Sequence, residues 1–225
     1  MFRKEKMVMQ SILFDLDGTI VNSQKGITNC ICYVLDYFQM PKPPVEDLLC
    51  FIGPPLKDSF MKHFGFDEEK AAFSVGKYRE RYNEIGVFEC ELYPGIQELI
   101  EHLHQKGYKL YLASSKPEIL CKKILGHFHL ENYFDGIFGA TMDGKIGTKE
   151  QVLEYLFETT GADRSTSILI GDTRFDAAGA REAGISCLGV TYGFGSKEEL
   201  EQEGVAALCD TAAEVEAYFE KTTAC

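Results

Sequence analysis

The sequence has no tryptophan and only seven prolines in 225 residues, and it has no apolar run long enough to span a membrane. Cations are also scarce: 23 Lys and Arg stand against 35 Asp and Glu, which gives a formal net charge of -12. Proteins that bind nucleic-acid polymers regardless of sequence need a basic surface, so this composition argues against that class. Small phosphorylated ligands remain compatible, because a few local cations can coexist with an acidic exterior.

A secretory signal is lacking as well. The basic start at residues 1–6 is followed by an apolar stretch that reaches Asp15 without a small-residue cleavage site. We therefore expect a cytoplasmic protein. The eight cysteines are scattered through the chain, which favours free and mostly buried thiols over a disulfide framework.

The order of predicted elements indicates an α/β fold with an insertion. From residue 93 onward helix and strand patterns alternate, which is typical of a mostly parallel sheet covered by helices. Residues 23–92 show helical patterns and no convincing strand. We predict a Rossmann-like core of residues 1–22 and 93–225 and a helical domain of residues 23–92. The expected strands cover residues 12–14, 109–113, 136–139, 167–170 and 186–190, and the expected core helices cover 96–105, 117–125, 149–160, 175–183, 197–203 and 212–219.

Two carboxylates follow the first predicted strand. If that strand extends through Leu16, Asp15 and Asp17 lie on the same side of it, because strand side chains alternate. Two like charges held so close repel, so the pair calls for a proton or a cation, most simply Mg²⁺. For this stretch alone, an Asp-Gly turn with backbone-capping carboxylates is an equally good interpretation.

Polar residues also follow the strand at 109–113. In open parallel sheets the functional crevice lies beyond the carboxyl ends of the strands. Ser114 and Ser115 come there, before Pro117, which we expect to be the first residue of a helix. Hydroxyls and free N–H groups at a helix start suit an anion, although they can equally serve only to satisfy the helix terminus.

A lysine opens the helix predicted from residue 149. Thr148 and Gln151 have the spacing of a capping box, which puts Lys149 in the first turn, where the helix dipole disfavours a cation. An anionic neighbour would explain this position. A solvated surface lysine is the alternative, and Lys145 competes for the same role.

Two further acids follow the strand at 167–170. Asp172 comes at the strand end and Asp176 lies four residues later, so a helical continuation would place both on one face. Aspartates often cap helices, so neither residue decides the matter alone. Four acids, a serine and a lysine at the ends of several strands together favour a functional site.

These motifs resemble the haloacid dehalogenase superfamily of aspartate-nucleophile phosphatases, and the resemblance covers nearly the whole chain. They occur in the family's order: Phe14-Asp15-Leu16-Asp17-Gly18-Thr19, Ser114, Lys149 and Gly171-Asp172-x-x-x-Asp176. The helical insertion lies where phosphoglycolate phosphatases, β-phosphoglucomutases and related 5′-nucleotidases carry a mobile cap. Residues 51–56 and 190–195 are most similar to the phosphoglycolate-phosphatase and nucleotidase-like members.

The resemblance implies that Asp15 attacks phosphorus and forms an aspartyl-phosphate. Asp17 would protonate the leaving oxygen and later deprotonate the hydrolytic water. Asp17 also counts against dehalogenase chemistry, which in this superfamily proceeds without the second acid.

The same resemblance implies a Mg²⁺ cofactor and a phosphate cradle. The metal would be held by the Asp15 carboxylate, the Asp17 main-chain carbonyl and Asp172. Asp176 would support these ligands without binding the metal itself. The phosphoryl oxygens would be held by Ser114 and Lys149, assisted by backbone N–H groups near Gly18 and Ser115.

We therefore expect a Mg²⁺-dependent hydrolase of a small phosphorylated metabolite. A phosphomutase of the β-phosphoglucomutase type is the alternative, although Gly171, in place of the glutamate common in mutases, favours a hydrolase. A non-catalytic phosphoacceptor domain is a distant third, because such domains are much shorter and lack the insertion. Substrate choice should depend on the insertion, where the cations to examine are Lys57, Arg79 and Arg81.

Overall fold

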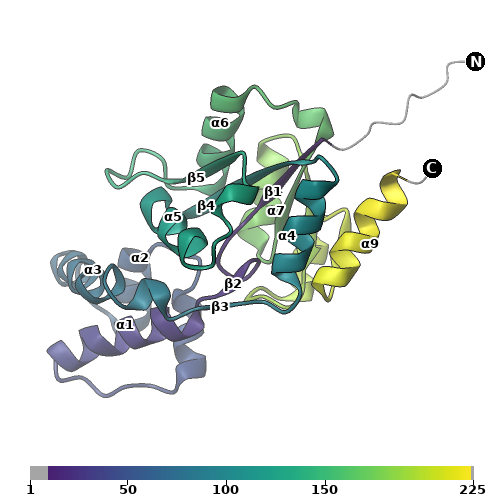
Figure 1. Cartoon of the computed structure of the whole chain (residues 1–225). Helices are drawn as coiled ribbons and strands as arrows, with labels where there is room; N and C mark the ends of the chain where they lie inside the picture. Colours follow the sequence, from purple (N-terminus) through teal and green to yellow (C-terminus); the bar gives the residue numbers. More distant parts are fainter. Residues whose placement is uncertain (1–9, 224–225) are drawn as a thin grey trace, which may run out of the picture. The chain divides into compact units, whose positions relative to one another are not determined.

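The computed structural model describes residues 10–223, and the chain divides into two compact units. The first unit takes in the chain up to Ile20 and from Leu92 onward, and the second is Val21–Glu91 (Figure 1). The basic start at residues 1–6 and Cys225 lie outside the described residues. The predicted helical insertion at 23–92 corresponds to the second unit, while its role as a cap stays a prediction.

The first unit is built on a six-stranded sheet in the order β5-β4-β1-β6-β7-β8. All its described pairings are parallel, and central β1 pairs with β4 and β6. The predicted α/β class with a parallel sheet is therefore confirmed. The sequence pattern missed β8, because three residues are too few to show alternation. The strands are β1 Ser11–Phe14, β4 Lys109–Pro117, β5 Gly136–Ala140, β6 Ser167–Gly171, β7 Ser186–Val190 and β8 Ala207–Cys209.

Helices cover this sheet on both faces (Figure 1). Side chains alternate along β1, so Leu13 packs into a cluster with residues of α6, α7 and α8, whereas Ile12 and Phe14 are fully buried on the opposite face. On the other face α4 packs against α9. These helices are α4 Ile96–Gln105, α5 Glu118–His127, α6 Lys149–Thr160, α7 Arg174–Glu182, α8 Lys197–Glu203 and α9 Ala212–Thr223.

The second unit is helical, with α3 packed against both α1 and α2 around buried residues such as Ile31 and Phe60. Asp67 caps α3 by accepting a hydrogen bond from the Lys70 N–H. The two-residue strands β2 and β3 pair where the chain enters and leaves this unit, and they are too short to have been predicted. The elements are β2 Val21–Asn22, α1 Gln24–Tyr37, α2 Leu56–Phe64, α3 Glu68–Tyr82 and β3 Glu91–Leu92, with 3-10 turns at Val45–Phe51 and Gly86–Phe88.

None of the helices between residues 10 and 223 combines the length and the apolar character needed to cross a membrane.

Candidate active site

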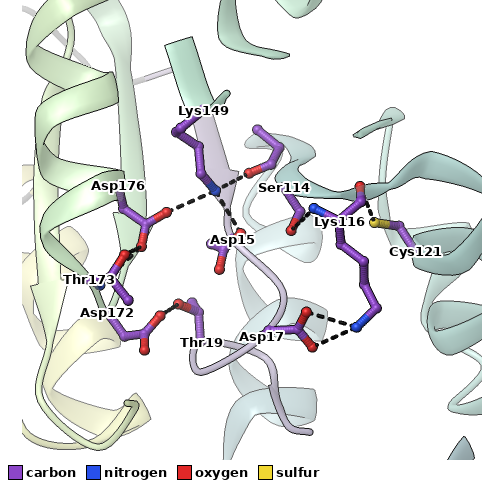
Figure 2. A network of polar contacts seen from close by, with 11 residues as sticks. Asp15, Asp17, Thr19, Ser114, Lys116, Cys121, Lys149, Asp172, Thr173 and Asp176 are labelled. Carbon is purple, nitrogen blue, oxygen red and sulfur yellow. Dashed lines mark hydrogen bonds and ion pairs between the residues drawn. The ribbon is translucent and has the colours of Figure 1, made fainter. Parts of the chain in front are cut away.

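The two acids after β1 do not share one side of a strand. β1 ends at Phe14, so Asp15 and Asp17 lie in the following turn, and the expectation that both face the same way is wrong. Figure 2 shows the Asp15 carboxylate directed at Lys149 and the Asp17 carboxylate directed at Lys116. Each carboxylate therefore has its own amine as a counter-charge.

Lys149 lies at the centre of the site. Its Nζ is 2.6 Å from Asp15 Oδ1, 2.8 Å from Asp176 Oδ1 and 2.7 Å from the Ala113 carbonyl oxygen. Burial lowers the pKa of Lys149, but the charges of Asp15 and Asp176 more than offset burial, so this pKa lies above its ordinary value. The flanking carboxylates explain why a cation is tolerated in the first turn of α6.

The cap of α6 is the predicted one. Thr148 and Gln151 form a full capping box, which fixes the backbone at Lys149. The competing Lys145 is exposed and pairs with Asp143 at 3.0 Å. Lys149 is thus the lysine in the cluster.

Three carboxylates gather next to this lysine. Asp15, Asp172 and Asp176 are buried, and each offers a carboxylate oxygen within 4.8 Å of the others. Burial raises the pKa of Asp15 to about 6 despite Lys149, and the charge of Asp176 adds to the rise. Burial, with the charges of Asp176 and Asp15, also raises the pKa of Asp172 well above its usual range. Hard oxygen donors crowded in this way fit a divalent cation such as Mg²⁺.

The three acids differ in how their oxygens are used. Asp176 Oδ2 accepts from the Thr173 N–H at 3.0 Å and its hydroxyl at 2.7 Å, and Oδ1 contacts Lys149, so both oxygens already have partners. This favours a supporting role for Asp176. Asp172 precedes α7, whose N-cap is Thr173, so the prediction that Asp172 and Asp176 share a helix face is wrong although both reach the cluster.

Glycines make room for Asp172. Gly18 has φ +92°, and a Cβ on it would lie 2.0 Å from Asp172 Oδ2. A Cβ on Gly193 would lie 2.3 Å from the same oxygen, which accepts a hydrogen bond from the Phe194 N–H at 2.7 Å. The loop after β7 therefore holds Asp172 from one side and the turn after β1 holds it from the other.

The serines lie within the carboxyl-terminal part of β4 and not after it as predicted, because the strand continues to Pro117. Ser114 is buried, and Ser115 is partly exposed in an irregular part of the strand where the register with β5 shifts. Pro117 is the last residue of β4 and the N-cap residue of α5, so its predicted place as the first helical residue is wrong by one position.

The sequence reasoning missed Lys116 as a site residue. Its Nζ donates to both oxygens of Asp17, at 3.0 and 2.8 Å. The available signal was its position directly after Ser115, at a strand end already expected to face the crevice.

The predicted specificity cations all lie in the second unit. Lys57 pairs with Glu68 at 2.6 Å, and Arg81 donates two hydrogen bonds to Glu89, at 2.6 and 3.0 Å. Their charges are thus compensated within this unit. Arg79 is exposed on α3. A role in specificity stays a prediction for all three.

Comparison with known proteins places this site in a family. A family model described as haloacid dehalogenase-like hydrolase matches residues 12–190. The chain belongs to that family. This confirms the resemblance inferred from the motifs.

Relatives of this haloacid dehalogenase-like hydrolase carry different names. A 5′-nucleotidase of Pseudomonas aeruginosa is 38% identical over 93% of this chain and 95% of its own length. Tyrosine-protein kinase PtkA of Mycobacterium tuberculosis is 30% identical over 90% of this chain and 69% of its own length. The crystal structure of a predicted phosphatase from Clostridium acetobutylicum is 40% identical, with a TM-score of 0.90 over 95% of this chain and 99% of that one. Family and fold together identify the chain as a phosphatase of this family.

Proposed function

We propose that this hydrolase removes the phosphoryl group from small phosphate monoesters with Mg²⁺, through an aspartyl-phosphate on Asp15. The observation that carries the proposal is the setting of Asp15 at the carboxyl end of central β1. It is buried, 2.6 Å from Lys149 Nζ, and beside the carboxylates of Asp172 and Asp176. This combines a nucleophile with a cation and a set of oxygen ligands.

The donor set supports Mg²⁺ as the cofactor. The Asp15 and Asp172 carboxylates and the Asp17 main-chain carbonyl would hold it, while Asp176 keeps Lys149 in place. When bound, Mg²⁺ offsets the repulsion between the attacking carboxylate and the phosphate dianion.

The two acids divide the chemistry. An Asp15 oxygen attacks phosphorus, the bond from phosphorus to the leaving oxygen breaks, and that oxygen takes a proton from Asp17. Water then attacks the phosphoenzyme and gives a proton to Asp17, and the bond from phosphorus to Asp15 breaks to release phosphate. Lys149 and Ser114 hold the phosphoryl oxygens. Two acids are needed because the esterified one cannot also carry the proton.

The proposed substrate is a free phosphorylated metabolite in the cytoplasm, and a 5′-nucleoside monophosphate is the first to test. The name of the 5′-nucleotidase relative supports this choice. The seven cysteines between residues 10 and 223 carry thiols and form no disulfide, which supports a reducing compartment. The leaving group would be selected by the helical second unit, acting as a cap that excludes water.

The test is turnover of p-nitrophenyl phosphate with Mg²⁺ and with EDTA. We expect EDTA to abolish turnover, and Asp15→Asn to lower kcat by at least about a thousandfold, because an amide is a poor nucleophile. Asp143→Asn is the matched control, since Asp143 is exposed in a loop and should leave the rate unchanged. Full activity of Asp15→Asn would contradict the proposal. A requirement for a sugar bisphosphate activator, with little release of phosphate, would identify a phosphomutase instead.

A further inference from the structure

The ion pair between Lys116 and Asp17 stands apart from the three clustered carboxylates. The two side chains are only 7% and 17% exposed, and both Asp17 oxygens accept from the one amine. Among the described residues, the carboxylates close enough to share a metal ion at this site are Asp15, Asp172 and Asp176. Figure 2 shows the Asp17 carboxylate pointing at Lys116.

An irregularity between β4 and β5 brings Lys116 to this position. Ser114 pairs with Gly139, and the next pairing is Pro117 with Ala140, so the register shifts around Lys116. In a regular strand, side chains alternate between the two faces of the sheet. A bulge breaks this alternation and redirects a side chain, often next to an active site. Here the Lys116 side chain points toward Asp17, in the turn after β1 (Figure 2).

The backbone of Lys116 is fixed on several sides. Its N–H donates to Ser114 Oγ at 3.3 Å, and its carbonyl oxygen accepts from Cys121 Sγ at 3.5 Å. The same carbonyl lies so close to Gly139 that a Cβ there would be 2.6 Å from it. These contacts anchor the Lys116 backbone, which a residue needs if its side chain is to hold another side chain in place.

We propose that Lys116 is a positioning residue that holds the Asp17 carboxylate toward the leaving-group oxygen and keeps it out of the acid cluster. The inference rests on the proposed function, in which Asp17 carries the proton. When one Asp17 oxygen holds that proton, the other still accepts from Lys116, so the carboxyl plane stays fixed while the proton passes to the leaving oxygen. In the second step the same oxygen takes the proton of the attacking water.

The experiment measures how the rate depends on the leaving group. Lys116→Met removes the amine and keeps the length of the side chain. The readout is kcat/KM with Mg²⁺ for p-nitrophenyl, 4-chlorophenyl and phenyl phosphate, because this parameter covers the steps up to departure of the leaving group. Nitrophenoxide leaves readily without a proton, whereas phenoxide needs one. We expect Lys116→Met to lower kcat/KM for phenyl phosphate at least about tenfold more than for p-nitrophenyl phosphate.

Three further variants separate positioning from a structural role. Lys116→Arg keeps a cation that can bind both Asp17 oxygens and should retain the wild-type dependence on the leaving group. Lys122→Met is the matched control, because Lys122 is exposed on α5 and pairs with Glu118. Asp17→Asn combined with Lys116→Met should behave as Asp17→Asn alone, because the lysine acts only through that acid.

The outcomes are distinct. The ratio of kcat/KM for two esters does not depend on the fraction of folded enzyme, so partial unfolding cannot imitate the effect. Equal loss for all three esters, or additive losses in the double variant, would overturn the role of Lys116 and leave the proposed function standing. Absence of Mg²⁺-dependent turnover in the wild type would overturn both.

Discussion

At the scale of single residues, Lys149 compensates two buried carboxylates at once. It is 5% exposed and contacts both Asp15 and Asp176. A buried ion pair adds little stability over an apolar replacement of both partners, whereas removal of one partner leaves the other charge uncompensated. The amine thus contributes to the stability of the fold in addition to its proposed role in holding the phosphoryl oxygens.

Lys149→Met should therefore destabilise the metal-free protein by about 3–5 kcal/mol, because it leaves the clustered acids without a counter-charge. Urea unfolding at neutral pH measures this loss, and saturating Mg²⁺ should restore part of it. Lys145→Met is the control, since the Lys145 side chain is 84% exposed and its loss should change stability by less than about 0.5 kcal/mol. A loss of the same size in both variants would show that Lys149 does not compensate the cluster.

Lys149 and Lys116 show which contacts of a single residue can be predicted from the sequence and which cannot. Lys149 could be predicted because its signal is local: a cation in a first turn, next to a capping box at Thr148 and Gln151. The pairing of Lys116 with Asp17 could not, because it depends on a register shift between β4 and β5 that no local pattern encodes.

At the scale of elements, the loop after β7 orients Asp172, a candidate metal ligand that follows β6. The Phe194 N–H donates to Asp172 Oδ2, and Gly193 approaches both that oxygen and the Gly18 carbonyl too closely for any side chain. A loop that contributes no side chain to the acid cluster therefore determines the orientation of one of its members.

Gly193→Ala should weaken Mg²⁺ binding by about 10- to 100-fold, because the added Cβ must displace Asp172. The apparent Mg²⁺ constant, obtained from activity as a function of metal concentration, measures the effect. Gly147→Ala is the matched control, since a Cβ there meets nothing within 4 Å. An unchanged Mg²⁺ constant in Gly193→Ala would show that Asp172 is not a ligand.

Element prediction succeeded where a segment was long enough to carry a pattern. The long helices and the strands β1, β4, β5, β6 and β7 were predicted within a few residues. The errors concern short or special segments: β2, β3 and β8 have two or three residues each, and Pro117 ends a strand and does not begin a helix. In these cases pairing with a distant strand, and not the local sequence, decides the structure.

At the scale of the whole molecule, the acid cluster links stability to pH. The folded-state pKa of Asp15 is raised from 3.8 to about 6, and that of Asp172 is raised as well, mainly by burial. A raised carboxyl pKa contributes stability below the unfolded pKa, and this contribution is lost as the pH rises through the folded value. The metal-free protein should therefore become less stable as the pH rises from about 4 through about 6.

Because the proposed Mg²⁺ would bind the ionised carboxylates, it should stabilise the protein more at pH 7.5 than at pH 5, where protons compete for the same oxygens. Thermal unfolding with saturating Mg²⁺ and with EDTA, at both pH values, measures the two shifts in Tm. An equal shift at both pH values would contradict a metal site at Asp15 and Asp172.

The position of the site could be predicted at this scale because the parallel sheet collects its strand ends. Asp15 and Asp172 directly follow β1 and β6, and Ser114 lies in the carboxyl-terminal part of β4, although the three residues are far apart in sequence. The separation of the Asp15 and Asp17 carboxylates was not predictable, because it depends on where β1 stops and on which amine meets each acid.

The central place of β1 also bears on how the nascent chain acquires its fold. Ser11 pairs with Lys109 on one side and with Ser167 on the other, and the whole helical second unit is synthesised between β1 and its first partner. A ribosome therefore delivers an apolar strand whose first edge stays unpaired until β4, at Lys109–Pro117, has been made, and whose second edge stays unpaired until β6, at Ser167–Gly171, has been made. Until then, its unpaired N–H and C=O groups and its apolar side chains leave the segment open to premature association.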